Sequence, residues 1–282
     1  MFAEQLVREG DPVAALTALQ DQIRKDPSSA KLRTFLFQLL SVLGQWPRAL
    51  TQLNVAGELD AATLPMVQTY REAIQCEALR EEIFAGKRAP LIFGQPQPWL
   101  AQLITALQFD ATDPQRAADL RAQAFDAAPV IAGNIDGTPF AWLADADQRL
   151  GPVIEAIING RYFWIPFCRI RRIEIDAPTD LRDAVWTAAS FTWTNGASTV
   201  GLIPTRYNDT ASSSDDALRL ARRTEWVGEG AGRGLGQRMF ATEAADYALM
   251  DIRLIELDSP DDDPGEALDN AVIDDTSSAN HG

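Results

Sequence analysis

The sequence predicts an α+β protein, in which an N-terminal all-α domain of short helical repeats precedes a C-terminal α+β domain with a mixed or antiparallel sheet. Three observations predict this fold class. One segment recurs 34 residues later, the helical spacing of apolar residues continues to about residue 128, and aromatic and β-branched segments follow. We therefore expect a helical domain at 1–128, an α+β domain at 129–257 and a disordered acidic tail at 258–282.

The repeat aligns residues 10–19 with residues 44–53, so that Gly10 matches Gly44. An offset of 34 residues is the period of tetratricopeptide repeats. The apolar spacing predicts six helices, at about residues 13–26, 29–43, 47–56, 64–85, 99–107 and 113–128. A stack of such repeats offers a groove for a peptide, and a helical scaffold without a ligand is the alternative.

Turn signals divide the C-terminal half into strands and short helices. Asp136-Gly137 and Asn195-Gly196 each predict a hairpin, the second with a type I′ turn. Strands are predicted at residues 162–167, 169–175, 190–194, 198–203, 237–240 and 249–257. Helices are predicted at residues 150–158, 178–188 and 215–223, the last capped by Ser213 or Ser214.

The charge balance narrows the class of partner. The net charge is −15, and the chain from Asp258 onward has eight acidic residues and no Lys or Arg. Nucleic acid and anionic membranes attract basic surfaces, so neither is an expected partner. No signal peptide and no continuous apolar span is found in the sequence, and the two cysteines lie far apart, as in a reducing compartment. We expect a cytoplasmic protein.

Catalytic residues are scarce. The single histidine is His281, which excludes a Ser-His-Asp or Cys-His site within the fold, and Cys76 and Cys168 alone cannot hold zinc. Asp145 and Asp147 form an acidic pair that could serve acid–base chemistry, but a turn into a following helix is the expected role. The sequence therefore predicts no enzyme activity, no metal and no cofactor.

The run Gly228–Gly236 contains five glycines and invites a phosphate-loop interpretation. Neither common spacing fits, because no Gly-Lys-Ser/Thr follows and no Gly-x-Gly-x-x-Gly occurs. A flexible loop between two strands is the expected use of these glycines. A nucleotide-binding or hydrolytic protein that uses this loop remains the alternative function.

Aromatic and arginine side chains gather in the second half of the chain. Trp, Tyr and Arg are the usual anchors of protein interfaces, although most such aromatics are expected in the core. The predicted partner-binding residues are Trp164, Trp193, Arg206, Tyr207, Trp226 and Arg238.

The same region contains an ordered series of motifs. The earlier ones are Asp136-Gly137-x-Pro139-Phe140-x-Trp142, Asp145-x-Asp147-x-Arg149-Leu150-Gly151-Pro152 and Asn159-Gly160-Arg161-Tyr162-x-Trp164-x-Pro166-Phe167. The later ones are Leu181-Arg182-Asp183, Trp193-x-Asn195-Gly196, Pro204-x-Arg206-Tyr207, Arg222-Arg223-Thr224-Glu225-Trp226, Gly234-Leu235-Gly236-Gln237-Arg238 and residues 246–253. Together they resemble the core of the ImpE/SciE/TagJ accessory proteins of bacterial type VI secretion, and the resemblance extends to about Leu257.

The resemblance implies a cytoplasmic, non-enzymatic adaptor of the type VI secretion system. It implies binding to the N-terminal helix of the small contractile-sheath subunit, and a role in sheath turnover beside the AAA+ disassembly ATPase. It provides no catalytic residues for this sequence, and it does not locate the helix-binding groove.

Overall fold

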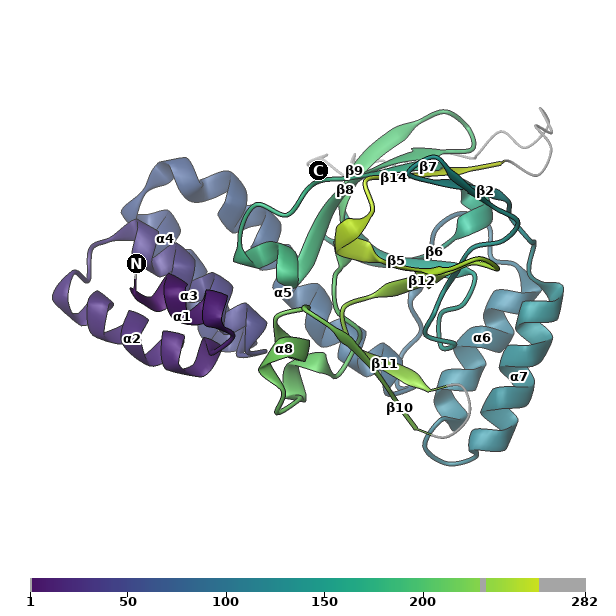
Figure 1. Cartoon of the computed structure of the whole chain (residues 1–282), viewed down its shortest axis with the longest axis horizontal. Coiled ribbons are helices and arrows are strands. Elements are labelled where there is room, and N and C mark those ends of the chain that lie inside the picture. The colour runs from purple at the N-terminus through teal and green to yellow at the C-terminus, as the bar shows by residue number, and fades with distance from the viewer. Residues whose placement is uncertain (1, 229–231, 259–282) are drawn as a thin grey trace, which may run out of the picture.

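The computed structural model describes residues 2–228 and 232–258. Its N-terminal arm consists of α1 (Phe2–Glu9), α2 (Pro12–Lys25), α3 (Ala30–Val42), α4 (Trp46–Leu59) and α5 (Leu64–Phe84) (Figure 1). Gly10 and Gly44 adopt positive φ angles of 96° and 66° at the turns after α1 and α3. Glycine takes this conformation without the steric cost that other residues meet. The pairs α1–α2 and α3–α4 are therefore equivalent units, as the 34-residue period predicted.

A second helical pair, α6 (Pro98–Phe109) and α7 (Pro114–Ala127), follows the short strand β1 (Leu91–Ile92). Asp113 caps α7 by accepting a hydrogen bond from the Arg116 backbone N–H at 3.1 Å. The six predicted helices correspond to α2–α7. The α1 helix was not predicted, because eight residues are too few for the helical period to emerge.

Nine strands form the large sheet, in the order β1-β6-β5-β9-β8-β7-β14-β2-β3. Their bounds are β2 (Gly133–Ile135), β3 (Thr138–Phe140), β5 (Val153–Ile158), β6 (Arg161–Pro166), β7 (Ile170–Ile175), β8 (Trp186–Trp193), β9 (Ser198–Pro204) and β14 (Leu254–Leu257). The β1–β6 pair is parallel and the other pairs are antiparallel. The predicted α+β class with a mixed sheet is confirmed.

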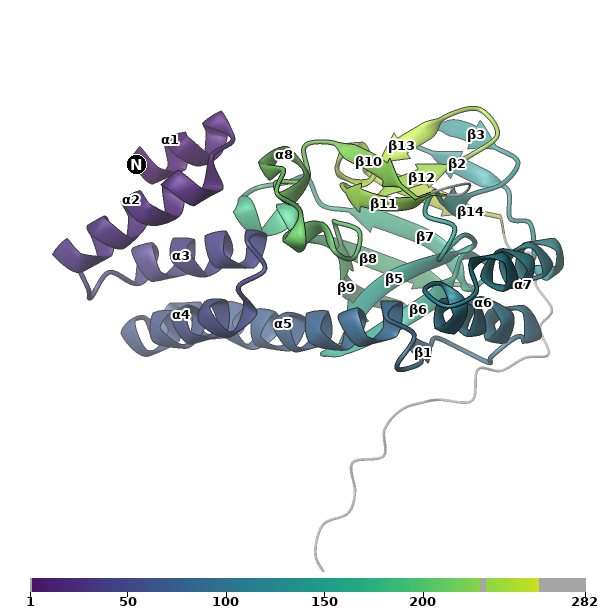
Figure 2. The ribbon, with the colours of Figure 1, turned by 90° about the horizontal axis from the view of Figure 1, so that it is seen from below.

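Smaller elements cover one face of this sheet. β4 (Ala144–Asp145), β12 (Met239–Ala241) and β13 (Asp246–Ala248) form a three-stranded sheet, and β10 (Thr224–Val227) pairs with β11 (Arg233–Gly236) beside the short helix α8 (Asp216–Arg219). In Figure 2 these strands lie on the opposite side of the large sheet from α5. The molecule is thus layered as helices, large sheet and small sheets.

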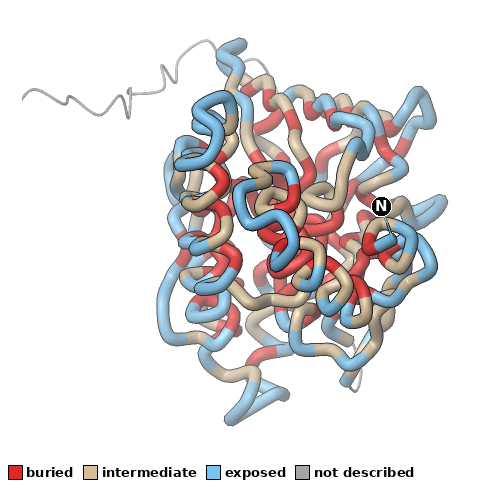
Figure 3. Tube along the Cα trace, turned by 90° about the vertical axis from the view of Figure 1, so that its left-hand side faces the viewer, coloured by how far each residue is buried: buried red, intermediate tan, exposed pale blue. Residues whose placement is uncertain are grey.

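Two hydrophobic cores separate these layers. Along β5, Val153 and Ile157 face the first core, whereas Ile154 and Ile158 face the second, as the two-residue period of a strand requires. The first core runs from α1 through α5 to the sheet, and the second lies between the sheet and the β12 layer. Figure 3 shows the buried positions gathered between the layers. The helical arm and the sheet therefore share one continuous core.

The predicted helix at residues 150–158 is wrong, because Val153–Ile158 forms β5 and all six of its residues are buried. A strand buried on both faces is a continuous apolar run, which lacks the alternation that distinguishes a strand from a helix. Gly151, with a φ of 55°, lies against the Phe125 ring, so a helix cannot begin there. The Gly-Pro pair that suggested a helix start is instead a tight bend before the strand.

Two other helices are shorter than predicted. Only Leu181–Ala184 is helical within residues 178–188, as one 3₁₀ turn with a capping box from Asp180 and Asp183, and β8 begins directly afterwards. The helix predicted at 215–223 covers Asp216–Arg219, and its cap is Asp215 rather than Ser213 or Ser214. After the first helix, the β-branched and aromatic residues Val185, Trp186 and Thr187 favour an extended chain. The second helix ends before Ala221, whose φ of 54° is not helical.

Both predicted hairpins are confirmed, but their turns differ. Asp136 and Gly137 both have positive φ, of 49° and 84°, which is a type I′ geometry between β2 and β3. Between β8 and β9 only Gly196 has a positive φ, and its N–H donates to the Trp193 carbonyl at 2.9 Å. The type I′ prediction for Asn195-Gly196 is therefore wrong. The strands predicted at 237–240 and 249–257 are also displaced, to β12 and β14.

Candidate functional site

A network of buried charges lies where the helical arm meets the sheet. Glu155 of β5 is fully buried, and its carboxylate receives two hydrogen bonds from Arg80 of α5, at 2.5 Å and 3.0 Å. Arg238 and the Tyr162 hydroxyl also donate to this carboxylate, and the Trp164 indole donates to Tyr162 at 2.9 Å. Every oxygen of this buried acid is paired, so the network is a structural joint between the two regions.

Arg238 is shared by two carboxylates, Glu155 and Asp145, and all three side chains are fully buried. Desolvation acts to raise the pKa of Glu155, but the charges of Arg80 and Arg238 outweigh it and lower this pKa to about 2. Desolvation raises the pKa of Asp145 to about 7, although Arg238 opposes the shift. The difference has a plain cause, because Glu155 has two guanidinium partners, Arg80 and Arg238, whereas Asp145 has one, the shared Arg238.

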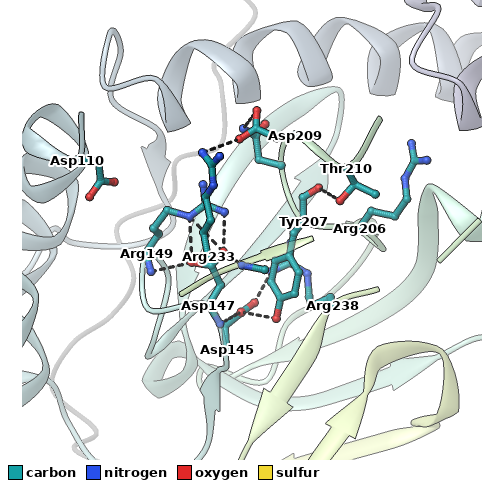
Figure 4. Close-up of polar contacts among 12 residues, drawn as sticks. Asp110, Asp145, Asp147, Arg149, Arg206, Tyr207, Asp209, Thr210, Arg233 and Arg238 are labelled. Carbon is teal, nitrogen blue, oxygen red and sulfur yellow. Dashed lines mark hydrogen bonds and ion pairs between the residues drawn. The ribbon is translucent and has the colours of Figure 1, made fainter. Parts of the chain in front are cut away.

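The predicted acidic pair, Asp145 and Asp147, belongs to this interior (Figure 4). Asp147 binds Arg149 through both oxygens, with the shortest contact at 2.6 Å, and accepts from the Gly234 N–H at 3.0 Å. The Tyr207 hydroxyl donates to Asp145 at 3.1 Å. Both carboxylates are almost completely buried and hold loops together, so they are closed to a substrate.

Two arginines of the C-terminal half cap helices of the arm. Arg206 donates to the carbonyls of Ser41 and Val42, at 3.3 Å and 2.7 Å, at the end of α3. Arg222 donates to the Val7 carbonyl in α1 at 2.6 Å. Val7 and Ser41 lie 34 residues apart, so they are equivalent positions of the two repeats. Cations at helix C-termini satisfy unpaired carbonyls and complement the helix dipole.

Trp186 fills the space between the arm and the sheet. Its indole N–H donates to Glu77 of α5 at 2.8 Å, and its ring lies 5.9 Å from Trp46 and 5.6 Å from Tyr70. Together with the two arginine caps, this side chain ties α5 and the C-terminal ends of α1 and α3 to the C-terminal half of the chain. These contacts hold the repeats and the sheet together.

The six predicted partner-binding residues are separated by the fold. Trp164, Arg206, Tyr207 and Arg238 are buried in the network, and Trp193 is buried in the second core, where it stacks on Phe93 and Phe191. Trp226 of β10 is 46% exposed and packs beside Tyr207, with 5.6 Å between the ring centroids. Trp226 is thus the member of the set with a substantial surface for a partner.

A polar cavity of about 360 Å³ opens at the junction of the arm and the sheet. Its wall includes Glu77, Arg80 and Arg206, whose charged groups are already bound to one another or to backbone carbonyls. The Asp209 side of the wall has a strained backbone, with a φ of 68°. The cavity belongs to the joint between the two regions.

An apolar groove of about 390 Å³ lies at the other end of the molecule, between the end of α7 and the β4–β12 edge. Its walls are residues 125 and 128–131 on one side, and residues 142–146, 148, 151–152 and 241 on the other. Val130 is 75% exposed and Trp142 is 37% exposed. Large apolar side chains grouped in an open groove are typical of a binding surface. The sequence patterns did not predict this groove.

The glycine run at 228–236 lies partly outside the described residues, which omit 229–231. Its flanks are β10 and β11, which pair as an antiparallel hairpin. Phosphate loops instead join a strand to the N-terminus of a helix. The predicted acidic tail also lies outside the described residues, beyond Asp258.

Two kinds of feature are absent from the described residues. Within 2–228 and 232–258, no helix is long and apolar enough to cross a bilayer. The same part of the chain contains no group of three or more His, Cys, Asp or Glu side chains placed to hold a metal ion.

Comparison with known proteins agrees with both halves of this architecture. Residues 6–74 match a tetratricopeptide repeat family, and residues 137–256 match the ImpE protein family. A crystal structure of a Vibrio parahaemolyticus protein superposes with a TM-score of 0.83, at 24% identity, over 92% of this chain and 98% of that one. This likeness shows a shared fold.

A closer relative has a described role. The chain is 55% identical over 262 residues to a Pseudomonas aeruginosa protein described as the type VI secretion system accessory component TagJ. The match covers 93% of this chain and 92% of the relative. With the motifs that build the buried network, it shows that this chain belongs to the TagJ/ImpE family of type VI secretion accessory proteins.

Proposed function

We propose that this protein is a cytoplasmic, non-enzymatic adaptor of the type VI secretion system. It binds the N-terminal helix of the small contractile-sheath subunit and assists sheath assembly or disassembly, acting indirectly alongside the AAA+ disassembly ATPase. The family supports the secretion role, because the Pseudomonas aeruginosa relative is described as an accessory component of that system. The tetratricopeptide match supports a role in protein–protein interaction.

The observation that carries this proposal is the apolar groove beside α7. An amphipathic helix binds by placing an apolar stripe into such a groove. Trp142 and Val130 both line the groove and are exposed, so a helix that occupies it could bury both side chains. The repeats are a poorer candidate, since α5 and the ends of α1 and α3 are already bound by Trp186, Arg206 and Arg222 of the same chain.

The candidate residues of the buried network contribute to this function through the groove wall. Asp145 is part of the groove wall, and its buried carboxylate is held from behind by Arg238 and Tyr207. The same pairing argues against catalysis, because the carboxylates that could act as acid and base are neutralised and closed to a substrate.

A binding titration tests the proposal. The ligand is a peptide that spans the N-terminal helix of the small sheath subunit encoded in the same genome. We expect saturable binding in the micromolar range or tighter, and a loss of about tenfold or more in affinity for Trp142→Ala and Val130→Asp. The absence of binding to the folded protein would reject this partner.

A matched control is available on the β8–β9 hairpin, which contributes no residue to the groove. Val200 is 73% exposed, close to the exposure of Val130. Val200→Asp places the same charge on an equally exposed valine. Its binding should equal that of the unmodified protein, so a similar loss in both variants would mean that the groove is not the site.

A further inference from the structure

The segments that line the apolar groove contain acidic but no basic side chains. Apart from Gly151 and Pro152, its lining residues come from segments 122–148 and 239–252, which contain no Lys or Arg. The arginines that bracket the first segment are both paired, Arg121 with Asp110 and Arg149 with Asp147. No unpaired basic side chain from these segments therefore offsets the negative charge at the groove.

Three exposed carboxylates, here called the acidic rim, belong to segments that form or adjoin its walls. Glu243 accepts hydrogen bonds from the backbone N–H groups of Ala141 and Trp142, at 2.7 Å and 3.4 Å, and the first of these bonds lowers its pKa. Asp126 follows the wall residue Phe125 in α7. Asp258 donates its backbone N–H to the Ala132 carbonyl at 2.9 Å, beside the wall residue Ile131. Glu243 is thus held directly against the Trp142 segment, and each of the other two carboxylates is close in sequence or in backbone pairing to a wall residue.

The acidic tail of the sequence follows Asp258. After this residue the chain continues for 24 residues with seven further acidic side chains and no Lys or Arg. Negative charge on a protein attracts oppositely charged partners and speeds their association. The composition of this segment has the same sign as the carboxylates of the rim.

We infer that the groove selects a basic amphipathic helix, with an apolar stripe that enters the groove and Lys or Arg on its flanks that face the acidic rim. This inference rests on the proposed function for the existence of a helical partner, and it adds the charge of that partner. A helix with acidic flanks is rejected by repulsion. A second copy of this chain is disfavoured for the same reason, since each copy has a net charge of −15.

Two designed helical peptides of about 18 residues, or about five turns, test the inference. They share one apolar stripe and differ only in their flanks, which are Lys in one and Glu in the other. With the full chain at low salt, we expect the Lys peptide to bind at least about tenfold more tightly, because each of three ion pairs adds a modest factor. The preference should shrink as salt is added.

Variants that replace carboxylates with amides test which acidic residues cause the preference for the Lys peptide. Asp126→Asn combined with Glu243→Gln and Asp258→Asn should abolish most of the preference for the Lys peptide. The control combination is Asp21→Asn, Glu58→Gln and Asp176→Asn, which removes the same charge from exposed positions away from the groove. This variant should keep the preference for the Lys peptide. A tail variant, with Asp261, Asp262 and Asp263 changed to Asn, should slow association of the Lys peptide without changing its contacts in the groove.

The outcomes separate this inference from the proposed function. Equal affinity for the two designed peptides, or a preference that survives in the rim variant, overturns the inference even when the sheath helix binds. Binding of the Lys peptide that is lost in Trp142→Ala and weakened in the rim variant supports it, even when the sheath helix does not bind. In that second case the proposed partner is rejected, and the preference of the groove for a basic helix is supported.

Discussion

Two regions of the molecule use their side chains in opposite ways. The junction between the helical repeats and the sheet is closed, because Trp186, Arg206 and Arg222 from the C-terminal half bind Glu77 and backbone carbonyls of the repeats. The groove beside α7 is open and keeps Val130 and Trp142 exposed. The comparison teaches that a repeat fold does not by itself locate a binding site, since its usual surface can be used to hold the molecule together.

The largest expected effect comes from breaking the closed junction at Arg238. Arg238→Met leaves Glu155 and Asp145 buried with one shared partner fewer, and removing one member of a buried ion pair costs about 3–5 kcal/mol. The free energy of unfolding in urea measures the loss. Arg88→Met, at an exposed ion pair with Glu82, is the control and should change stability by less than about 1 kcal/mol. Equal effects would mean that the network is not a stabilising joint.

The two arginine caps allow a comparison of a buried and an exposed contact within the closed junction. Arg206 is buried and binds two carbonyls of α3, whereas Arg222 is exposed and binds one carbonyl of α1. We expect Arg206→Met to cost about 2–3 kcal/mol and Arg222→Met about 1 kcal/mol. Hydrogen exchange should show faster exchange in α3 for the first variant and in α1 for the second. The reverse order of costs would contradict the role of burial.

A pH dependence should follow from Asp145. Its pKa is about 7 in the folded chain and 3.8 when unperturbed, so the folded state binds a proton that the unfolded state lacks between these values. The stabilisation that this group contributes to the folded state is fully present below pH 3.8 and is lost as the pH rises to about 7. The slope can reach about 1.4 kcal/mol per pH unit. Unfolding of the unmodified protein and of Asp145→Asn, measured from pH 4 to 7, should differ by this slope, and parallel curves would refute the shift.

The smallest expected effect concerns Trp226. It is the exposed member of the six residues predicted from sequence, and it lies on β10 rather than in the apolar groove. Trp226→Ala should change the free energy of unfolding by about 1 kcal/mol or less, because half of the side chain is already in water. Helix-peptide affinity should remain unchanged in the same variant. A clear loss of affinity would move the binding surface from the groove to the β10–β11 hairpin.

Local signals allowed much of the fold to be predicted. The 34-residue repeat, the helices α2–α7 and both hairpins depend on residues close together in the sequence, such as Gly10 with Gly44 or Asp136 with Gly137. The β5 strand was missed because burial on both faces removes the alternation that marks a strand. The lone Glu155 inside that apolar run was a usable signal, since a buried carboxylate requires a partner.

The candidate site could not be predicted in the same way. The partner of Glu155 is Arg80, which lies 75 residues away, so only the fold brings the two together. Trp and Arg are common both in interfaces and in cores, and their residue type could not tell Trp226 from Trp164, whose exposures are 46% and 0%. Val130 and Trp142 drew no attention as a pair, because the turn that brings them to one groove is a property of the tertiary structure.

The spacing of the two arginine caps has a further consequence. Arg222 and Arg206 bind carbonyls of the helical arm that lie 34 residues apart in the sequence. The C-terminal half therefore contacts one equivalent position in each of the two repeats. A third repeat placed before Phe2 would have no arginine of the C-terminal half to cap its first helix. A relative with a longer arm would therefore need another donor for the carbonyls at the end of that helix, or would leave them to water.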